Sequence, residues 1–544
     1  MTLFDAEHAA EFRRRGWWSD ETLSTAVARN AAQVPDSLAY TSGDRVITWA
    51  QFDQRADELA RRLAGAGIRP GSRVAVCMAD GIEIHVAFVA IERLSATIVG
   101  IGAKAGVREV AHIARQSQCE ALLTLAAQDG RDAGSLIADL AEREIRLKHL
   151  VLTLDGLGVR LTCAAEGGSE YWEVDEAALP AVATSPDDLF LVNSTSGTTG
   201  LPKAVMHTQN RWHYFHTQAA ANGELVDGEV MLSIVPAPFG FGLWTSHVTP
   251  IKLAAHTVVM PKFSPREAAR LIQEHKVTVL CCVSTQFIMM LADSSLEEFD
   301  ISSLRVVFTG GEAVPYAQAV EFEERTGSTI LQFYGSNETG LLSGTNLHDT
   351  PEQRLRTAGR IAPEMNVRLF EGANDVTSTG RGQPACFGPA LSLGYLDDEA
   401  ANASLFTDNG LMLMGDICEI DADGYLSVVG RISEFVVRGG KNISLAVVEA
   451  DALTHPAIRH AAAVAMPDPV LGERVCLFVE LHTGAEFDLE TLVAHLKAEG
   501  VSRELFPERL EIMPELPRSS GAKVAKGELR KLIAEKVAAE LAAR

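Results

Sequence analysis

The alternation of two hydrophobic patterns constrains the fold of this chain more than any other feature of its sequence. Between Glu21 and Cys119, segments with helical periodicity such as 52–67 alternate with short apolar runs such as 72–78, and each is closed by Gly or Pro. Apolar runs of the same kind recur at 188–193, 230–236, 276–283, 304–310 and 329–335. This alternation predicts an α/β fold in which helices cover mostly parallel sheets.

The sequence changes character after about residue 355, where turn-rich segments replace the alternation. The tetrapeptide DADG at 421–424 separates two apolar runs within 415–431, which is typical of a β-hairpin. The segment 350–363 is interpreted as an exposed linker or a substrate-side loop.

A chain of 544 residues is long enough for two or three domains of ordinary size. We place a boundary near residues 430–433, which gives an N-terminal domain over 1–430 and a smaller C-terminal domain over 431–544. The expected fold class is therefore a large α/β domain with a β-rich subdomain, followed by a small α+β domain.

The charge balance and the apolar runs exclude several kinds of partner. A formal net charge of -24 would repel phosphate backbones and anionic lipid, so we expect no nucleic-acid partner. No run of about 18 apolar residues occurs, and the first residues lack the apolar stretch of a signal peptide. The eight cysteines are scattered without zinc-binding spacing. We therefore expect a cytoplasmic protein with reduced thiols and no integral membrane association.

Hydroxyl side chains and glycines are concentrated directly after the run at 188–193, in Ser194-Thr-Ser-Gly-Thr-Thr-Gly-Leu-Pro-Lys203. Glycines allow a close backbone approach to an anion, hydroxyls donate hydrogen bonds, and a lysine adds positive charge. The spacing differs from a P-loop because Pro202 stands where that motif requires glycine. A flexible surface loop is the alternative. The segment predicts a phosphate-binding loop made of Thr195, Ser196, Gly197, Thr198, Thr199, Gly200 and Lys203.

This segment resembles the phosphate loop [ST]-[ST]-G-[ST]-T-G-x-P-K of the acyl-CoA synthetase and adenylation-domain superfamily. The resemblance continues in order over roughly residues 20–530. It implies an enzyme that activates a carboxylic acid with ATP and Mg2+, and a small C-terminal domain that is mobile. Within the superfamily, the segment 436–450 is most similar to cyclohexanecarboxylate and medium-chain acid–CoA ligases.

Two further motifs match the nucleotide-binding residues of this superfamily. Tyr334-Gly-Ser-Asn337-Glu338 is similar to Y-G-x-T-E, whose tyrosine lies near adenine and whose glutamate helps to hold magnesium. Asn337 stands where the family usually has Thr, and its amide retains the ability to hydrogen-bond the α-phosphate. Asp416 and Arg431 match the ribose-binding aspartate and the arginine that follows it.

The C-terminal domain carries the remaining matches. The segment 517–523 resembles the loop whose lysine contacts the substrate carboxylate and the α-phosphate, which implies that Lys523 is catalytic together with Lys203 and Glu338. Ser433 occupies the hinge position, where relatives often have Asp or Lys. The family's loop beside coenzyme A (CoA) corresponds here to Arg438, Gly439 and Gly440.

The sequence gives the weakest signal for the residues of the acid-binding pocket. The resemblance places it on Phe239, Gly240, Phe241, Gly310, Gly311 and Phe333, with 284–287 and Glu312 nearby. Each of these phenylalanines and glycines could equally be a packing residue. Since the six pocket residues are uncharged, we favour an apolar medium-chain, cyclic or aromatic acid as the substrate.

Three functions remain open at this point. The favoured one is an ATP-dependent acid–CoA ligase that forms acyl-CoA, AMP and pyrophosphate through an acyl-AMP. The second is a free-standing aryl-acid adenylating enzyme that loads a carrier protein, because FRRRGWW at 12–18 also occurs in that group. The third is a non-catalytic nucleotide- or acyl-binding regulator on the same fold, against which the retained motif residues argue. Dimers are common in such families, so a homodimer is compatible with each of them.

Overall fold

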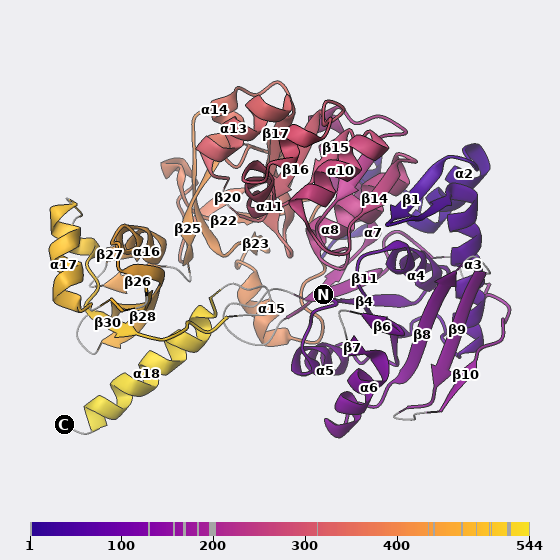
Figure 1. Ribbon diagram of the computed structural model, residues 1–544, viewed down its shortest axis with the longest axis horizontal. Helices are drawn as coiled ribbons and strands as arrows, with labels where there is room; N and C mark the ends of the chain where they lie inside the picture. The colour runs from indigo at the N-terminus through magenta and orange to yellow at the C-terminus, as the bar shows by residue number, and fades with distance from the viewer. Residues whose placement is uncertain are drawn as a thin grey trace.

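The computed structural model shows a large lobe and, towards the C-terminus, a smaller one (Figure 1). The described residues are 3–128, 131–155, 158–166, 170–181, 184–194, 203–312, 314–432, 435–438, 441–468, 472–482, 484–485, 487–499, 501, 503–518 and 524–542.

A nine-stranded sheet in the order β19-β18-β17-β16-β15-β13-β14-β1-β2 forms one half of the large lobe. All neighbours from β17 to β1 are parallel, and the outer pairs are antiparallel. Its strands are β1 (Leu38–Ser42), β2 (Arg45–Thr48), β13 (Val230–Ser233), β14 (His256–Val259), β15 (Val279–Cys281), β16 (Val306–Gly310), β17 (Thr329–Ser336), β18 (Gly340–Gly344) and β19 (Arg360–Ile361).

The other half is an eight-stranded sheet in the order β10-β9-β8-β5-β3-β4-β11-β12. Here β8, β5, β3, β4 and β11 run parallel, and antiparallel strands again occupy the outside. Its strands are β3 (Arg73–Cys77), β4 (Thr97–Ile101), β5 (Ala121–Leu125), β8 (Lys148–Asp155), β9 (Gly158–Ala164), β10 (Tyr171–Glu173), β11 (Leu191–Ser194) and β12 (Ala204–His207), while β6 (Ala127–Gln128) and β7 (Arg131–Asp132) pair separately.

Helices cover these sheets because their apolar residues repeat with a helical period. The helix α3 begins with a capping box between Thr48 and Gln51 and buries Trp49, Phe52 and Leu59 on one face. The described α-helices of the large lobe are α1 (Ala6–Arg14), α2 (Leu23–Gln33), α3 (Trp49–Gly65), α4 (Ile82–Arg93), α5 (Val107–Gln116), α6 (Ala133–Glu142), α7 (Gln209–Gly223), α8 (Gly240–Leu243), α9 (Thr249–Lys252), α10 (Pro265–His275), α11 (Ser284–Leu291), α12 (Ser295–Glu298), α13 (Tyr316–Thr326), α14 (Pro351–Arg356) and α15 (Glu399–Leu405).

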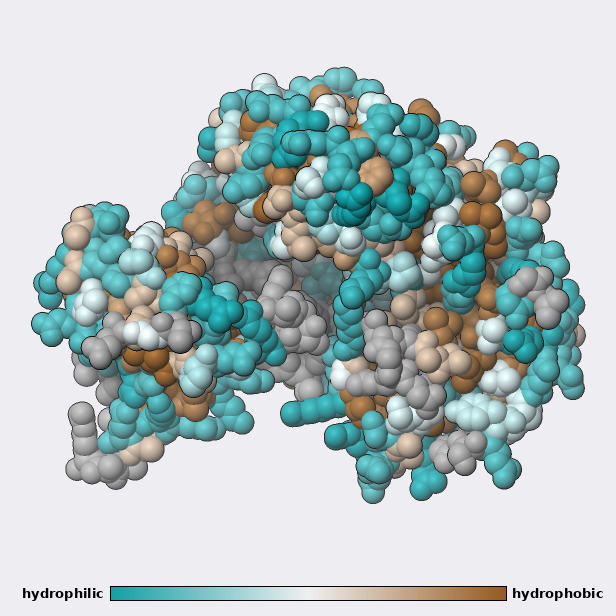
Figure 2. All heavy atoms as spheres, in the orientation of Figure 1, coloured by the Kyte–Doolittle hydropathy of each residue, from teal (hydrophilic) through white to brown (hydrophobic). Residues whose placement is uncertain are grey.

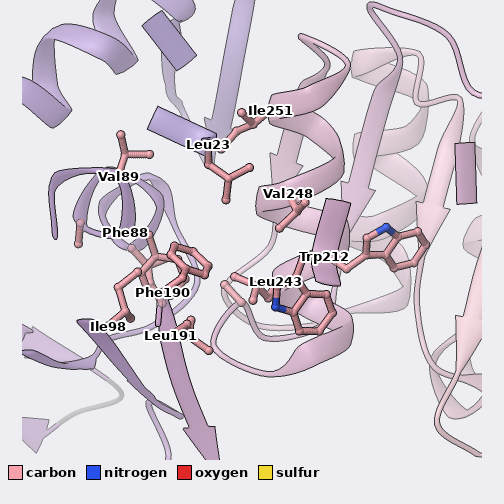
Figure 3. Close-up of a cluster of buried hydrophobic side chains, with 14 of the residues drawn as sticks. Leu23, Phe88, Val89, Ile98, Phe190, Leu191, Trp212, Leu243, Val248 and Ile251 are labelled. Atoms are coloured by element: carbon pink, nitrogen blue, oxygen red, sulfur yellow. The ribbon is translucent and has the colours of Figure 1, made fainter. Parts of the chain in front are cut away.

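One hydrophobic core joins the two sheets (Figure 3). The helix α4 is buried on almost every face, as expected for a helix without a polar side. Its Phe88 and Val89 lie on one side of the cluster in Figure 3, and Leu243, Val248 and Ile251 face them from the other. The two sheets are therefore packed into one body rather than into separate domains.

A β-rich sheet and the small lobe follow in the chain. The β-rich sheet contains β20 (Arg368–Glu371), β21 (Asn374–Asp375), β22 (Arg381–Cys386), β23 (Met412–Leu413), β24 (Asp416–Ile420) and β25 (Leu426–Arg431). The small lobe contains a five-stranded sheet of β26 (Phe435–Arg438), β27 (Lys441–Ser444), β28 (Ile458–Asp468), β29 (Gly472–Leu481) and β30 (Arg509–Ile512), with α16 (Leu445–Leu453), α17 (Leu489–Ala498) and α18 (Lys526–Ala542).

The predicted fold class is confirmed by this architecture, and so is the hairpin at DADG. The strands β24 and β25 are antiparallel, and Gly424 adopts a φ of 84° in the turn between them. The domain boundary near 430–433 stays a prediction. All eight cysteines are free thiols, and seven of them are buried.

The prediction of an exposed linker or loop at 350–363 is wrong. The segment forms the helix α14 and the strand β19. Thr350 begins the helix with a capping box to Gln353, and the buried Arg354 forms an ion pair with Glu323. The capping signal was present in the sequence, but the helix is too short to show a hydrophobic period.

Hydrophilic residues cover most of the face shown in Figure 2. Within the part of the chain that the structure describes, every helix is too short or too polar to cross a bilayer.

Candidate active site

A tight turn places Asn337 and Glu338 at the carboxyl end of the parallel strands, between β17 and β18. A Cβ atom on Gly335 would lie only 1.7 Å from the carbonyl oxygen of Gly340, and Gly340 itself has a φ of 68°. Glycine is therefore required at both positions. In open α/β sheets this edge is where ligands bind.

Tyr334 and Asp416 meet at this edge although 82 residues separate them in the sequence. The Tyr334 hydroxyl donates a hydrogen bond to Oδ2 of Asp416 over 2.7 Å. Burial, with the nearby Cys418 and Asp416, raises the pKa of Tyr334, so the hydroxyl stays a donor. Arg431 is the strand partner of Asp416 in the β24–β25 hairpin. The structure thus brings these three predicted residues together.

Glu338 and Lys203 share one aromatic neighbour, Tyr395. The Tyr395 hydroxyl donates to Oε1 of Glu338 over 2.7 Å, and the Lys203 ammonium lies 4.6 Å from the centre of the same ring. The segment carrying Tyr395 runs beside β12, since the Met206 amide donates to the Gly394 carbonyl over 2.9 Å. Lys203 directly precedes β12, which explains how the two charged residues come close.

An aromatic cluster lies next to these polar residues. The indole of Trp244 has ring-centre distances of 4.7 Å to Phe215, 5.7 Å to Phe241, 5.2 Å to Phe308 and 5.4 Å to Phe333. Trp244 begins a π-helical turn that runs to Val248, and such turns occur frequently at functional sites. Two predicted pocket residues, Phe241 and Phe333, therefore face a common tryptophan.

Gly240 lies where the cluster meets the polar residues. A Cβ atom built on Gly240 would lie 3.1 Å from Cη2 of Trp212 and 3.4 Å from Oδ1 of Asn337. Phe239, by contrast, is 37% exposed, and its ring packs against Gly102. Phe239 is therefore the most exposed of the three predicted pocket phenylalanines.

Backbone packing and backbone conformation explain why glycine occupies positions 310 and 311. A Cβ atom on Gly310 would lie 2.7 Å from the Phe333 carbonyl oxygen, so a side chain here would separate β16 from β17. Gly311 has a φ of 81°. Glu312 accepts a hydrogen bond from the Thr285 amide over 3.1 Å at the start of α11.

Other predicted site residues are placed elsewhere or not described. Arg438 belongs to β26 in the small lobe, where its strand partner is Lys441, and it is not brought to the residues above. The residues that lie outside the described part of the chain are Thr195, Ser196, Gly197, Thr198, Thr199, Gly200, Ser433, Gly439, Gly440 and Lys523.

Comparison with known proteins assigns the family. The family model described as AMP-binding enzyme matches residues 27–396, and the model described as AMP-binding enzyme C-terminal domain matches residues 447–523. The chain belongs to the AMP-binding enzyme family.

Relatives of this AMP-binding enzyme fall into two groups. It is 30% identical over 534 residues to the salicyl-AMP ligase / salicyl-S-ArCP synthetase of Mycobacterium tuberculosis, covering 96% of this chain and 93% of the relative. It is 29% identical over 538 residues to the medium-chain fatty-acid–CoA ligase of Escherichia coli, covering 97% and 93%. The AMP-binding enzyme is therefore an adenylate-forming acid ligase.

The fold also matches solved structures. The O-succinylbenzoate coenzyme A synthetase from Bacillus subtilis, in complex with ATP and a magnesium ion, superimposes with a TM-score of 0.76 at 23% identity, covering 93% of this chain and 98% of that one. That synthetase thus holds ATP and a magnesium ion on the same fold.

Glu338 of this AMP-binding enzyme is suited to a magnesium ion. No group of three or more His, Cys, Asp or Glu side chains is arranged to hold a metal among the residues that the structure describes. Mg2+ in nucleotide sites is usually held by one or two carboxylates, with phosphates and water as its other ligands. A single carboxylate whose one oxygen accepts from Tyr395 leaves lone pairs for such an ion.

Sequence reasoning missed several residues of this site. Tyr395 and Trp244 are two of them, and Arg211 is the third. The Arg211 side chain is buried and donates to the carbonyl oxygens of Asn337 and Ala390, each over 2.8 Å. Burial lowers the pKa of Arg211 to about 9, so the guanidinium remains charged at neutral pH. No local motif marks these residues, because their partners are distant in the sequence.

Proposed function

We propose that this enzyme is an ATP-dependent acid–CoA ligase that converts an apolar medium-chain, cyclic or aromatic acid, ATP and CoA into acyl-CoA, AMP and pyrophosphate. The observation that carries the acid class is the aromatic cluster around Trp244, which adjoins the turn of Asn337 and Glu338 through Gly240.

The composition of the cluster supports an apolar substrate. Its members Phe215, Phe241, Trp244, Phe308 and Phe333 carry no charge, and aromatic rings favour edge and offset-face contacts with other rings. An aliphatic chain would gain through burial against the partly exposed members of the cluster, Phe215 and Phe241. A second charged group on the acid would be desolvated here without a partner among these five residues.

In the first half-reaction the substrate carboxylate oxygen attacks the α-phosphorus of ATP, the bond to the bridging oxygen breaks, and pyrophosphate leaves. We assign adenine to Tyr334 and the ribose hydroxyls to Asp416, with Arg431 beside it. Glu338 would hold Mg2+, which neutralises phosphate charge, and Lys203 would contact the phosphates with residues 195–200. Lys523 would stabilise the charge that develops on the carboxylate and the leaving group.

In the second half-reaction the CoA thiolate attacks the acyl carbon and AMP leaves. We propose that the domain over 431–544 turns about Ser433 between the two steps, which brings the segment of Arg438, Gly439 and Gly440 to CoA. The similarity to a medium-chain fatty-acid–CoA ligase over nearly the whole chain supports CoA as the acceptor.

A carrier protein is the second candidate acceptor. The similarity to a salicyl-AMP ligase / salicyl-S-ArCP synthetase favours this alternative for aromatic acids. The first half-reaction is the same in both candidates, so only the acceptor differs.

A pyrophosphate-release screen tests the proposal. Short, medium, cyclic and aromatic acids are incubated with enzyme and MgATP, with and without CoA, and products are identified by mass spectrometry. We expect release with apolar acids and a CoA thioester in the complete mixture. Acyl-AMP that persists with CoA but is consumed by a phosphopantetheinylated aryl carrier protein would support the second candidate. ATP binding without release for any acid would indicate a regulator.

A further inference from the structure

A network of buried hydrogen bonds leads to Asn337, one of the predicted nucleotide-binding residues. Arg211 hydrogen-bonds Nδ1 of His207 through Nη1, and His207 Nε2 lies 2.7 Å from Oδ1 of Asn193. Asn337 donates from Nδ2 to the same Asn193 oxygen over 2.7 Å. Asn193 in turn donates from Nδ2 to the carbonyl oxygen of Pro238 over 3.1 Å.

The groups at the two ends of this network fix the direction of every hydrogen bond in it. A guanidinium only donates, so Nδ1 of His207 accepts and the proton of the neutral ring lies on Nε2. A backbone carbonyl only accepts, so Asn193 presents Nδ2 to Pro238 and Oδ1 to its other partners. His207 and Asn337 must therefore both donate to Asn193.

The direction of these hydrogen bonds determines the orientation of the Asn337 side-chain amide. Its Nδ2 faces Asn193, while its Oδ1 faces Gly240. Arg211 also fixes the Asn337 main chain through the carbonyl oxygen, over 2.8 Å. Hydrogen bonds therefore hold both the side chain and the main chain of Asn337, the residue before Glu338.

The network also joins the strands on either side of residues 195–202. Asn193 lies in β11 and His207 in β12, and the hydrogen bond between them crosses this antiparallel pair. A single imidazole therefore links the two strands that flank the predicted phosphate loop to the turn that carries Asn337 and Glu338.

We propose that His207 is a positioning residue for nucleotide binding, which orients Asn337 and Glu338 through Asn193 and Arg211 without touching the nucleotide. His207 and Asn193 are 0% exposed, so neither has a surface for a ligand. Burial and the positive charge of Arg211 keep the pKa of His207 well below its usual value, so the ring is neutral, as the hydrogen-bond network requires. The proposal concerns nucleotide binding alone and is independent of the acid and of the acceptor.

Calorimetric titration of MgATP and equilibrium dialysis of adenosine test the proposal in the full chain. Adenosine reports on Tyr334 and Asp416, whereas MgATP also reports on Asn337 and Glu338. His207→Leu removes the hydrogen bonds to both Asn193 and Arg211, so it should raise the Kd of MgATP about tenfold and leave the Kd of adenosine within about twofold. His207→Gln, whose amide can replace the Nε2–H donor, should return the Kd of MgATP to within about threefold of the original value.

A matched control and a second variant keep the outcome interpretable. His149 is also 0% exposed, but it lies in β8, which four strands separate from β12, so His149→Gln should leave both constants unchanged. If His207→Leu does not fold, the isosteric Asn193→Asp should show the same selective loss, because it replaces the donor to Pro238 by an acceptor. Equal losses for MgATP and adenosine, or no loss for either, would overturn the proposal. Absence of MgATP binding by the unaltered enzyme would refute the proposed function instead.

Discussion

The hydroxyl of Tyr395 donates a hydrogen bond to Oε1 of Glu338 across 57 residues of sequence, over 2.7 Å. The same ring lies under the ammonium of Lys203, at 4.6 Å. Two functions can therefore be separated in one side chain, since the hydroxyl contacts the carboxylate and the ring face contacts the cation. This separation leads to the first prediction.

Tyr395→Phe should raise the Mg2+ concentration required for half-maximal pyrophosphate exchange by about five- to tenfold, because one hydrogen bond to the carboxylate is lost while the ring remains. Tyr395→Ala should have a larger effect, since Lys203 also loses its neighbour. Tyr425→Phe is the matched control, because Tyr425 donates to Asp349 over 2.6 Å outside the site. An unchanged Mg2+ requirement in Tyr395→Phe would show that the contact is only structural.

Glu338→Gln should depress adenylation by about 10² and raise the Mg2+ requirement, since the amide keeps the shape of the side chain but removes its charge. Isotopic pyrophosphate exchange measured across a magnesium titration gives both quantities. Full activity at limiting magnesium would reduce Glu338 to a turn residue.

Lys523→Ala should cripple acyl-AMP formation and spare thioester formation from supplied acyl-AMP, because its charge is needed only while the carboxylate attacks ATP. The two half-reactions are assayed separately with the same enzyme preparation. Equal losses in both would contradict this division of roles.

Ser433→Pro should block thioester formation and leave adenylation largely intact. The predicted nucleotide residues precede or include Arg431, whereas Lys523 and the predicted CoA-side loop follow it, so a pivot between them is expected. Proline fixes φ near about -65° and removes an N–H, which hinders rotation at this position. Pyrophosphate exchange and CoA-thioester formation are compared in the variant. If exchange is lost as severely as thioester formation, or if neither changes, Ser433 is not the pivot.

Phe241→Ala should raise the KM for an apolar ring acid about tenfold and leave the KM for ATP unchanged, because it removes a ring that stacks on Trp244. Phe263→Ala is the control, since Phe263 is also partly buried but packs against a different core cluster. A parallel rise in the KM for ATP would indicate that Phe241 supports the fold rather than the acid.

Apolar runs in the sequence predicted β3 and β11 of the eight-stranded sheet and β13, β15, β16 and β17 of the nine-stranded sheet, because buried strands appear as short apolar runs. They did not predict the antiparallel strands at the edges. The strand β10 exposes all three of its residues, Tyr171 to Glu173, so it has no apolar run to detect. The helix α14 was missed for the related reason that only its caps and Arg354 carry a signal.

The sequence motifs named the residues that the structure gathers at one edge, including Tyr334 and Asp416, and their roles stay predictions. They could not name Tyr395, His207 or Arg211. Each of these acts through a hydrogen bond to a residue in another segment, and such a bond leaves no periodic or local trace. A histidine within an otherwise apolar strand, as at His207, is the only hint that the sequence offered.

The buried guanidinium of Arg211 sets an order of events during synthesis. Its carbonyl partners belong to Asn337 and Ala390, which are 126 and 179 residues further along the chain. A buried cation without its hydrogen-bond partners is strongly destabilising. A nascent chain that ends before Ala390 therefore leaves the Arg211 guanidinium without one of its two carbonyl partners, however complete its two sheets are. The capacity to hold a nucleotide should arise late on the ribosome, almost at the moment when the large lobe is finished.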